Sequence, residues 1–357
     1  MKKLTYLCIE LEKLTDIRTL SKEQLIAQLE QLGEKPFRAK QIYEWLWQKS
    51  AVDFDDMTNL SKELREKLKA HFVIHTISAY KVQKSNDGTI KSAFQLHDNH
   101  LIEGVLIPTE DRATACVSSQ VGCSLTCSFC ATGFLKRERN LTAAEIYDQV
   151  VLINKQSNES VGRNLSNIVF MGMGEPLLNY SNVVSAIDKI TSEEGLNMSA
   201  KRITVSTAGI AKMIKKLADD GVKFNLALSL HAADDEKRNT IMPINEQNNI
   251  EALIEALKYF QSKCKGEVTF EYILLDGVND TIDDAKKLID ICKQLEDVKI
   301  NVIEYNKIDQ ADFHKSTVET REKFIDYLSK HKVIANVRKS RGKDIDAACG
   351  QFANKDQ

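Results

Sequence analysis

The sequence has no long hydrophobic run and no large excess of charge of one sign. Near the start, Glu10 and Glu12 interrupt the apolar residues before they could form the core of a signal peptide. No later stretch reaches the roughly 18 consecutive apolar residues that a membrane-spanning helix needs. The formal net charge of −2 indicates no particular partner. These absences predict a folded cytoplasmic protein without a membrane partner.

Cysteine is sparse, with eight residues in a chain of 357. Without a secretion signal, this usage fits thiol, metal or cluster chemistry better than a framework of disulfides. Cys123, Cys127 and Cys130 lie together in CSLTCSFC, and a nearby fourth cysteine is missing. A loop with this spacing can reach three corners of an iron-sulfur cube, which leaves one iron without a protein ligand. The alternatives are a zinc site completed by a distant Cys or His, and three buried thiols without a ligand.

The chain shows no repeat of solenoid period and no low-complexity tract. With 43% hydrophobic and 28% charged residues, it can bury a large core as one large domain or two small ones. The pattern of apolar residues changes near residue 95. We predict an N-terminal helical accessory domain with linking strands over residues 1–95, a core over 96–350 and a C-terminal tail over 351–357.

The first part of the chain predicts helices followed by a short sheet. Apolar residues recur at helical spacing over residues 21–32, 37–48 and 58–72. Ser61 is well placed to cap the third helix. The next stretch alternates between apolar and polar residues and turns at Asp87-Gly88 and at Asp98-Asn99. It predicts a short antiparallel sheet that links the two parts of the chain.

From residue 113 onward, strand-like and helical stretches alternate. The strand-like runs are residues 113–119, 166–172, 202–209, 223–231, 267–277 and 298–306. Amphipathic helices lie between most of them, and in one of these Thr142 and Glu145 have the spacing of a capping box. A late strand over 333–340 follows a helix over 317–331. The order predicts an α/β fold with a partial (β/α)6 barrel, whose chemistry collects at the C-terminal ends of the strands.

Basic residues gather in two places despite the balanced total charge. Residues 321–343 contain eight Lys or Arg against two acidic residues, and KRER at 136–139 follows the three cysteines. Solvated surface charge explains either patch taken alone. A role in binding nucleic acid needs a second observation.

Three further residues, Cys349, Cys116 and His231, have two explanations each when taken alone. Cys349 lies between Ala348 and Gly350, which suits close approach to a ligand but also suits packing. Cys116, inside an apolar strand, has the same alternative. His231 ends a strand, where it could make a core hydrogen bond or contact a ligand. Glu103 by itself predicts a surface carboxylate. Cys8, Cys264 and Cys292 are assigned to packing.

The cysteine loop resembles that of the radical S-adenosylmethionine (SAM) superfamily. Phe129 stands just before the last cysteine of the loop, and Gly174, Glu175 and Pro176 follow the second barrel strand as GEP. The resemblance implies a radical SAM barrel with one [4Fe–4S] cluster. SAM is then both cosubstrate and missing ligand, because its amino and carboxylate groups chelate the open iron.

Five motifs in order resemble those of the RlmN and Cfr rRNA adenine methyltransferases over essentially the whole chain. They are CVSSQVGCSLTCSFCATG, FMGMGEPLLN, VSTAG, LSLHA and DIDAACGQ. The resemblance implies that Cys123, Cys127 and Cys130 bind the cluster. It implies that SAM is bound by Gly174, Glu175, Ser206, Ser229, Leu230, His231 and Asn306.

The same resemblance implies an unusual route for the methyl group. Adenine C2 and C8 are electrophilic, so an electrophilic methyl from SAM meets no nucleophile there. In the family, the cysteine that matches Cys349 takes a methyl from one SAM, and a second SAM supplies the radical that activates it. Cys116 matches the cysteine that releases the covalent adduct through a transient disulfide with Cys349. Glu103 matches the proposed proton acceptor.

The implied partners are 23S rRNA, some tRNAs and a reducing electron donor such as flavodoxin. We expect a monomer, because no exposed apolar stripe stands out beyond the core pattern. The N-terminal domain and the basic patches would then contact RNA. Pro176 and LSLHAADDEKR resemble RlmN and favour C2 methylation; Cfr-like methylation of C8 is the alternative. The stretch after Asn306 departs from the Pro-containing loop of many members. A zinc-stabilised RNA-binding protein without catalysis is the hypothesis from another class.

Overall fold

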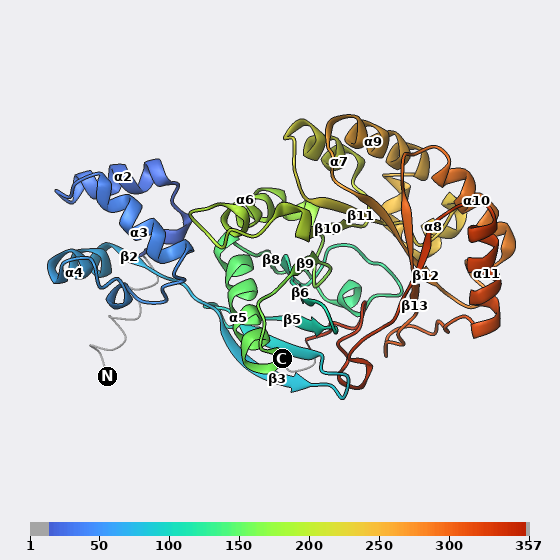
Figure 1. Cartoon of the computed structure of the whole chain (residues 1–357), viewed down its shortest axis with the longest axis horizontal. Helices are drawn as coiled ribbons and strands as arrows, with labels where there is room; N and C mark the ends of the chain where they lie inside the picture. Colours follow the sequence, from blue (N-terminus) through green and yellow to red (C-terminus); the bar gives the residue numbers. More distant parts are fainter. Residues whose placement is uncertain (1–13, 355–357) are drawn as a thin grey trace.

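The N-terminal part of the computed structural model, which describes residues 14–354, is a small helical domain (Figure 1). Its helices are α2 (Lys22–Gln31), α3 (Phe37–Trp47) and α4 (Lys62–His71), and β1 (Thr15–Asp16) pairs in parallel with β2 (Phe72–Val73). The three predicted helices are confirmed. Ser61 caps α4 as predicted, because its hydroxyl accepts a hydrogen bond from the backbone N–H of Leu64.

The helical domain docks on α5 (Ala143–Val161) through a few buried contacts. The ring of Trp47 meets the ring of Tyr147 edge-on at 5.1 Å, and Tyr147 Oη donates to the carbonyl oxygen of Trp47. Arg18 Nη1 lies 2.7 Å from the carboxylate of Asp148. Removing a buried aromatic such as Trp47 costs about 3–5 kcal/mol. These contacts fix the position of the domain beside the barrel.

Over residues 14–354 the central element of the fold is a ten-stranded sheet. Its strand order is β14-β13-β12-β11-β10-β9-β6-β5-β4-β3. The strands are β3 (Ser78–Lys84), β4 (Ile90–Gln95), β5 (Leu101–Pro108), β6 (Ala113–Cys116), β9 (Asn167–Phe170), β10 (Ile203–Thr207), β11 (Asn225–Ser229), β12 (Val268–Leu274), β13 (Lys299–Glu304) and β14 (Ala335–Arg338). Neighbours from β6 to β14 are parallel, whereas β3, β4, β5 and β6 pair antiparallel. The predicted α/β partial barrel is confirmed, and the late strand extends it.

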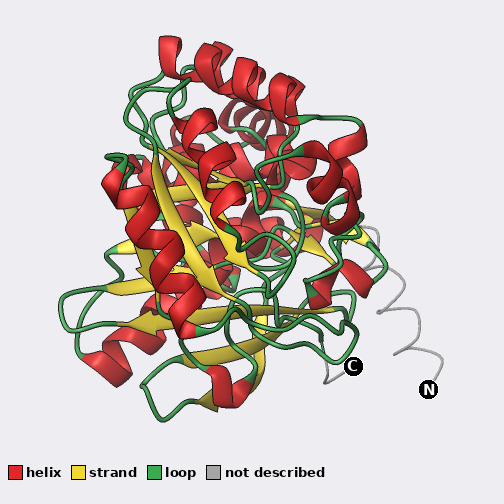
Figure 2. Ribbon diagram, turned by 90° about the vertical axis from the view of Figure 1, so that its right-hand side faces the viewer, coloured by secondary structure: helices red, strands yellow, loops and turns green. Residues whose placement is uncertain are grey.

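Helices cover the outer face of the parallel strands (Figures 1 and 2). Besides α5 they are α6 (Tyr180–Thr191), α7 (Ala211–Asp219), α8 (Asp235–Ile241), α9 (Ile250–Lys263), α10 (Ile282–Cys292) and α11 (Val318–Lys330). The predicted capping box at the start of α5 is present, with reciprocal hydrogen bonds between Thr142 and Glu145. None of the helices between residues 14 and 354 is long and apolar enough to cross a membrane.

The linking strands are continuous with the barrel rather than a separate sheet. The sheet passes from β4 to β5 across the boundary predicted at residue 95. The segment after β14 returns to these strands: Gly342 N donates to Asp87 Oδ2 at 3.0 Å, and Asn354 Nδ2 donates to the carbonyl oxygen of Leu101 at 2.8 Å. The predicted tail therefore begins as packed structure, since Phe352 and Asn354 are buried.

Candidate active site

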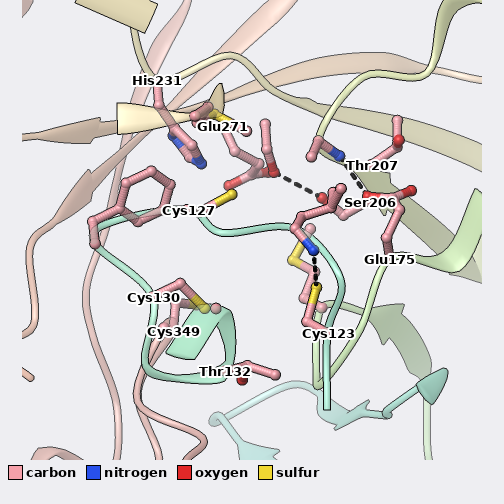
Figure 3. A pocket seen from close by; sticks show the side chains of 18 of the residues that line it. Cys123, Cys127, Cys130, Thr132, Glu175, Ser206, Thr207, His231, Glu271 and Cys349 are labelled. Carbon is pink, nitrogen blue, oxygen red and sulfur yellow. Dashed lines mark hydrogen bonds between the residues drawn. The ribbon is translucent and has the colours of Figure 1, made fainter. Parts of the chain in front are cut away.

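A pocket opens at the C-terminal ends of the parallel strands, where the sequence predicts the chemistry to lie (Figure 3). It is lined by the three cysteines of the loop and by residues from the ends of β9, β10, β11, β12, β13 and β14. Among the lining residues are Cys123, Cys127, Cys130, Gly174, Glu175, Ser206, Thr207, Ser229, His231, Glu271, Arg338 and Cys349. Most of the predicted site residues are thus brought together.

The cysteine loop is held by backbone hydrogen bonds to its own turns and to α8. Gly133 N donates to the carbonyl oxygen of Cys130 at 2.9 Å, and Ser128 N donates to that of Ile241 at 3.0 Å. Burial raises the pKa of Cys123 to about 12 and also raises the pKa values of Cys127 and Cys130. Burial therefore disfavours the thiolate form of all three side chains, whereas a bound metal would favour it.

The donor set fits a cluster better than a single zinc ion. Figure 3 shows Cys123, Cys127 and Cys130 among the side chains that line the pocket. Between residues 14 and 354, no three His, Cys, Asp or Glu side chains are arranged to hold one metal ion. In a cubane cluster each thiolate binds a different iron, so the three sulfurs need not converge on a point. The three loop cysteines therefore fit a cluster of this kind.

The GEP turn brings a carboxylate to the pocket wall. Gly174 has φ of 91°, and a Cβ at this position would lie 2.5 Å from Gln120 Cβ, so only glycine fits. The buried carboxylate of Glu175 accepts hydrogen bonds from Ala208 N at 2.7 Å and Leu177 N at 3.0 Å. Burial raises its pKa, and the two backbone N–H groups partly oppose that effect. These two hydrogen bonds fix the orientation of the carboxylate at the pocket wall.

His231 is a buried, neutral imidazole at the end of β11. Burial, and secondarily the charge of Arg238, lowers the pKa of His231 to about 3. Nδ1 accepts a hydrogen bond from Ile273 N at 3.1 Å, so the ring proton resides on Nε2. The residue has φ of 58°, a left-handed conformation that costs about 1–2 kcal/mol outside glycine. Its ring also meets Phe129 edge-on at 4.8 Å, which fixes it beside the cysteine loop.

The two hydroxyls predicted to face SAM lie on neighbouring strands, with Ser206 Oγ and Ser229 Oγ 3.3 Å apart. Leu230 and Asn306 are not among the lining residues. Leu230 is fully buried, and its backbone carbonyl accepts from Arg238 Nε at 2.9 Å. Asn306 donates to the carbonyl oxygen of Cys349 at 3.3 Å, while its own Oδ1 is buried without a partner. That unpartnered oxygen is available to a ligand's donor.

Cys349 and Cys116 are far apart in the sequence, but both line a second opening. Both are free thiols, and Cys349 also lines the active-site pocket, whereas Cys116 does not. Burial, reinforced by Cys349, raises the pKa of Cys116 to about 12. Cys264 and Cys292 are buried free thiols outside the active-site pocket, and Cys8 lies outside the described residues.

Glu103 is a buried residue of β5, so the expectation of a surface carboxylate for this residue alone is wrong. Its side chain forms an ion pair with Lys91 at 2.7 Å and accepts from Ala353 N at 3.0 Å. It does not line the active-site pocket, but it faces the C-terminal segment that carries Cys349.

Two charged residues of the pocket wall were not predicted from the sequence. Glu271 and Arg338 form an ion pair at 3.3 Å, and Asn301 Nδ2 donates to Glu271 at 2.8 Å. Cys349 raises the pKa of Arg338, with burial opposing the shift. Their signal in the sequence was a charge inside each of two strand-like runs, which is uncommon on a strand that is covered on both faces.

Much of the predicted basic surface is engaged in ion pairs. Arg139 of the KRER stretch binds Asp98 and Glu145. In the C-terminal stretch, Arg321 and Lys343 both bind Glu304, and Arg338 faces the pocket. Clustering of positive charge in the sequence therefore does not translate directly into a free basic face.

Comparison with known proteins agrees with this fold and site. A model of the radical SAM superfamily matches residues 117–290. The crystal structure of a radical SAM methyltransferase from Sphaerobacter thermophilus superimposes with a TM-score of 0.89 at 40% identity, over 95% of this chain and 99% of that one. The parallel barrel with its three-cysteine loop is that of a radical SAM protein.

The full-length relatives are more specific. A model of the ribosomal RNA large subunit methyltransferase N-terminal domain matches residues 15–74. The chain is 59% identical over 340 residues to a probable dual-specificity RNA methyltransferase RlmN of Cytophaga hutchinsonii, which covers 95% of this chain and 93% of the relative. It is 56% identical to the corresponding protein of Christiangramia forsetii, over 98% and 99% of the two chains. The chain belongs to the RlmN family.

Proposed function

We propose that this protein methylates C2 of an adenosine in the peptidyl-transferase region of 23S rRNA and of an anticodon-loop adenosine in some tRNAs. The proposal takes the dual specificity from the names of the relatives. The proposal also includes a reducing electron donor such as flavodoxin and a monomeric protein. Cfr-like methylation of C8 has no observation in its favour here, and nucleoside mass spectrometry against 2-methyladenosine and 8-methyladenosine standards tells the two products apart.

Cys123, Cys127 and Cys130 would hold a [4Fe–4S] cluster at the pocket. SAM would lie against Gly174, Glu175, Ser206, Ser229, Leu230, His231 and Asn306, with the Glu175 carboxylate toward its ammonium group. When bound, this pair of groups supplies a methyl group and a 5′-deoxyadenosyl radical, at the cost of two SAM per methylation. The neutral His231 offers an N–H donor without adding charge.

The single observation that carries the proposal is the position of Cys349. This thiol shares one pocket with the three cysteines of the loop, and it shares a second opening with Cys116. A sulfur at that position could accept a methyl group as a thioether and later present it to a base turned into the barrel mouth. Cys116 would then form the transient disulfide that releases the RNA, and Glu103 would accept the proton from the ring carbon.

Mass spectrometry of the purified protein tests this route. We expect a methyl group on Cys349 in the wild type and RNA covalently trapped on Cys116→Ala. The matched control is Cys264→Ala, which removes a buried thiol outside the pocket and should trap no RNA. An unmodified Cys349 in a protein that contains iron would contradict the methyl-cysteine route.

A further inference from the structure

A buried ion pair joins two strands of the antiparallel sheet that was predicted to link the two parts of the chain. Lys91 on β4 and Glu103 on β5 are 5% and 1% exposed, and Lys91 Nζ lies 2.7 Å from Glu103 Oε1. Taking two charges out of water is expensive, and their attraction offsets this only where further hydrogen bonds satisfy both groups. A buried pair is therefore weak evidence for stability and points to a role in holding a particular geometry.

The further hydrogen bonds of this pair go to the C-terminal segment, residues 346–353. Lys91 Nζ donates to the carbonyl oxygen of Asp346 at 3.1 Å. Its ammonium group also lies 5.6 Å from the centre of the Phe352 ring, within the range of a cation–π contact. Glu103 Oε2 accepts from Ala353 N at 3.0 Å. The pair thus binds the segment on both sides of Cys349.

Cys349 itself is held by other parts of the barrel. Asn306 Nδ2 donates to the carbonyl oxygen of Cys349, and Ala131 N donates to that of Gly350 at 2.7 Å. Thr132 Oγ1 donates to the carbonyl oxygen of Phe352, also at 2.7 Å. Loss of Lys91 would leave these three hydrogen bonds in place. Lys91 therefore does not hold Cys349 itself; it contacts Asp346 and Phe352 of the segment and the carboxylate of Glu103.

We propose that Lys91 is a positioning residue, which fixes the Glu103 carboxylate against the segment that carries Cys349. The inference rests on the proposed role of Glu103 as proton acceptor. A buried carboxylate that loses its cation is forced to move toward water or to take up a proton, and in either case it no longer serves as a positioned base. The defect should fall on the step that removes the proton and should spare the transfer of a methyl group to Cys349.

Hydrogen exchange of the full-length protein without SAM or RNA tests the positioning directly. In Lys91→Met we expect the amide of Ala353 to exchange at least about tenfold faster than in the wild type, because its acceptor is no longer held. Lys91→Arg keeps the charge and should restore slow exchange, and Lys258→Met, which removes an exposed lysine of α9, should not alter it. Equal exchange in Lys91→Met and the wild type would overturn the proposal.

Glu103→Gln is the second variant, in case Lys91→Met does not fold. Lys91 Nζ and Ala353 N meet different oxygens of Glu103, and in glutamine one of these positions is an NH2 donor. The buried ammonium group of Lys91 should keep the remaining oxygen, so that the amide of Ala353 loses its acceptor. Faster exchange at Ala353 is again expected. Exchange as slow as in the wild type in this variant would argue against the carboxylate as the link.

Turnover distinguishes positioning from general damage. Lys91→Met should retain the methyl group on Cys349, accumulate the covalent protein–RNA adduct and lose at least about tenfold in product. The double variant with Glu103→Gln should lose no more than Glu103→Gln alone, because residues that act through one another are not additive. Additive losses, or loss of the methyl group from Cys349, would sink the proposal. A wild type without that methyl group would contradict the proposed function, whereas the exchange experiment would still decide the role of Lys91.

Discussion

The loop that carries Cys123, Cys127 and Cys130 and the segment that carries Cys349 reach one pocket by different means. The loop is short, and its spacing alone places three thiols along one wall. The segment at residues 342–354 has little regular structure, and long-range hydrogen bonds hold it to the turn between β3 and β4, to β4 and β5, and to the barrel mouth. One of these, from Thr132 to Phe352, spans 220 positions. A local site can thus be read from a motif, whereas a site built from distant strands depends on the whole fold.

The largest effect should follow a change in the cysteine loop. Cys127→Ala removes one of three cluster ligands, and we expect loss of the cluster and of all methylation. Iron and sulfide content, with visible absorption, measures the first, and nucleoside mass spectrometry measures the second. Cys292→Ala, a buried thiol outside the pocket, should keep both. Iron bound at the wild-type level in Cys127→Ala would show that the loop is not the cluster site.

The second-largest effect should follow the loss of Arg238, whose contacts no local sequence pattern indicates. Arg238 is fully buried and donates to the carbonyl oxygens of Leu230 and Ala208 and to Asn245 Oδ1. Arg238→Met leaves these acceptors without partners, which should lower the free energy of unfolding by at least about 3 kcal/mol.

Urea unfolding measures the effect of Arg238→Met. Its control is Arg112→Met, which removes an exposed arginine and should change stability by less than about 1 kcal/mol. A similarly small change for Arg238→Met would mean that water replaces the lost hydrogen bonds and that the strand ends do not depend on this residue.

The buried imidazole of His231 should make the free energy of unfolding depend on pH. Its pKa is lowered from 6.5 to about 3, so the neutral form is favoured by folding. The stability from this residue is complete above pH 6.5 and is lost as the pH falls toward 3, by about 1.4 kcal/mol per pH unit. His231→Gln keeps an acceptor for Ile273 N and should remove this dependence from the unfolding free energy of the apoprotein. Identical pH profiles for the two proteins would contradict a buried neutral imidazole.

The smallest effect should come from a purely local device. Thr142→Ala removes the N-cap of α5 and should cost about 1 kcal/mol in thermal or urea unfolding. Thr142→Ser retains the hydroxyl and should stay close to the wild type. A loss as large as that of Arg238→Met would show that this cap supports tertiary structure as well as its own helix.

Much of the fold follows from local patterns. The strands over residues 113–306, the helices between them and the cap at Ser61 were all predicted, because each depends on side chains a few positions apart. The roles of Cys116, Cys349 and Glu103 came from resemblance alone and remain proposals. Taken by themselves, two of these residues suited packing and the third suggested surface exposure.

The sequence by itself determined the order of strands and helices, the cysteine loop and the family to which the chain belongs. Only the tertiary structure decided that Lys91 meets Glu103, that Arg338 meets Glu271 and that Arg238 binds the ends of two strands. Such partners lie on different strands, and which atoms meet depends on sheet register and on the path of the returning C-terminal segment. Local spacing in the sequence determines the helices and strands, whereas the role of a buried charge depends on the partner that the fold places beside it.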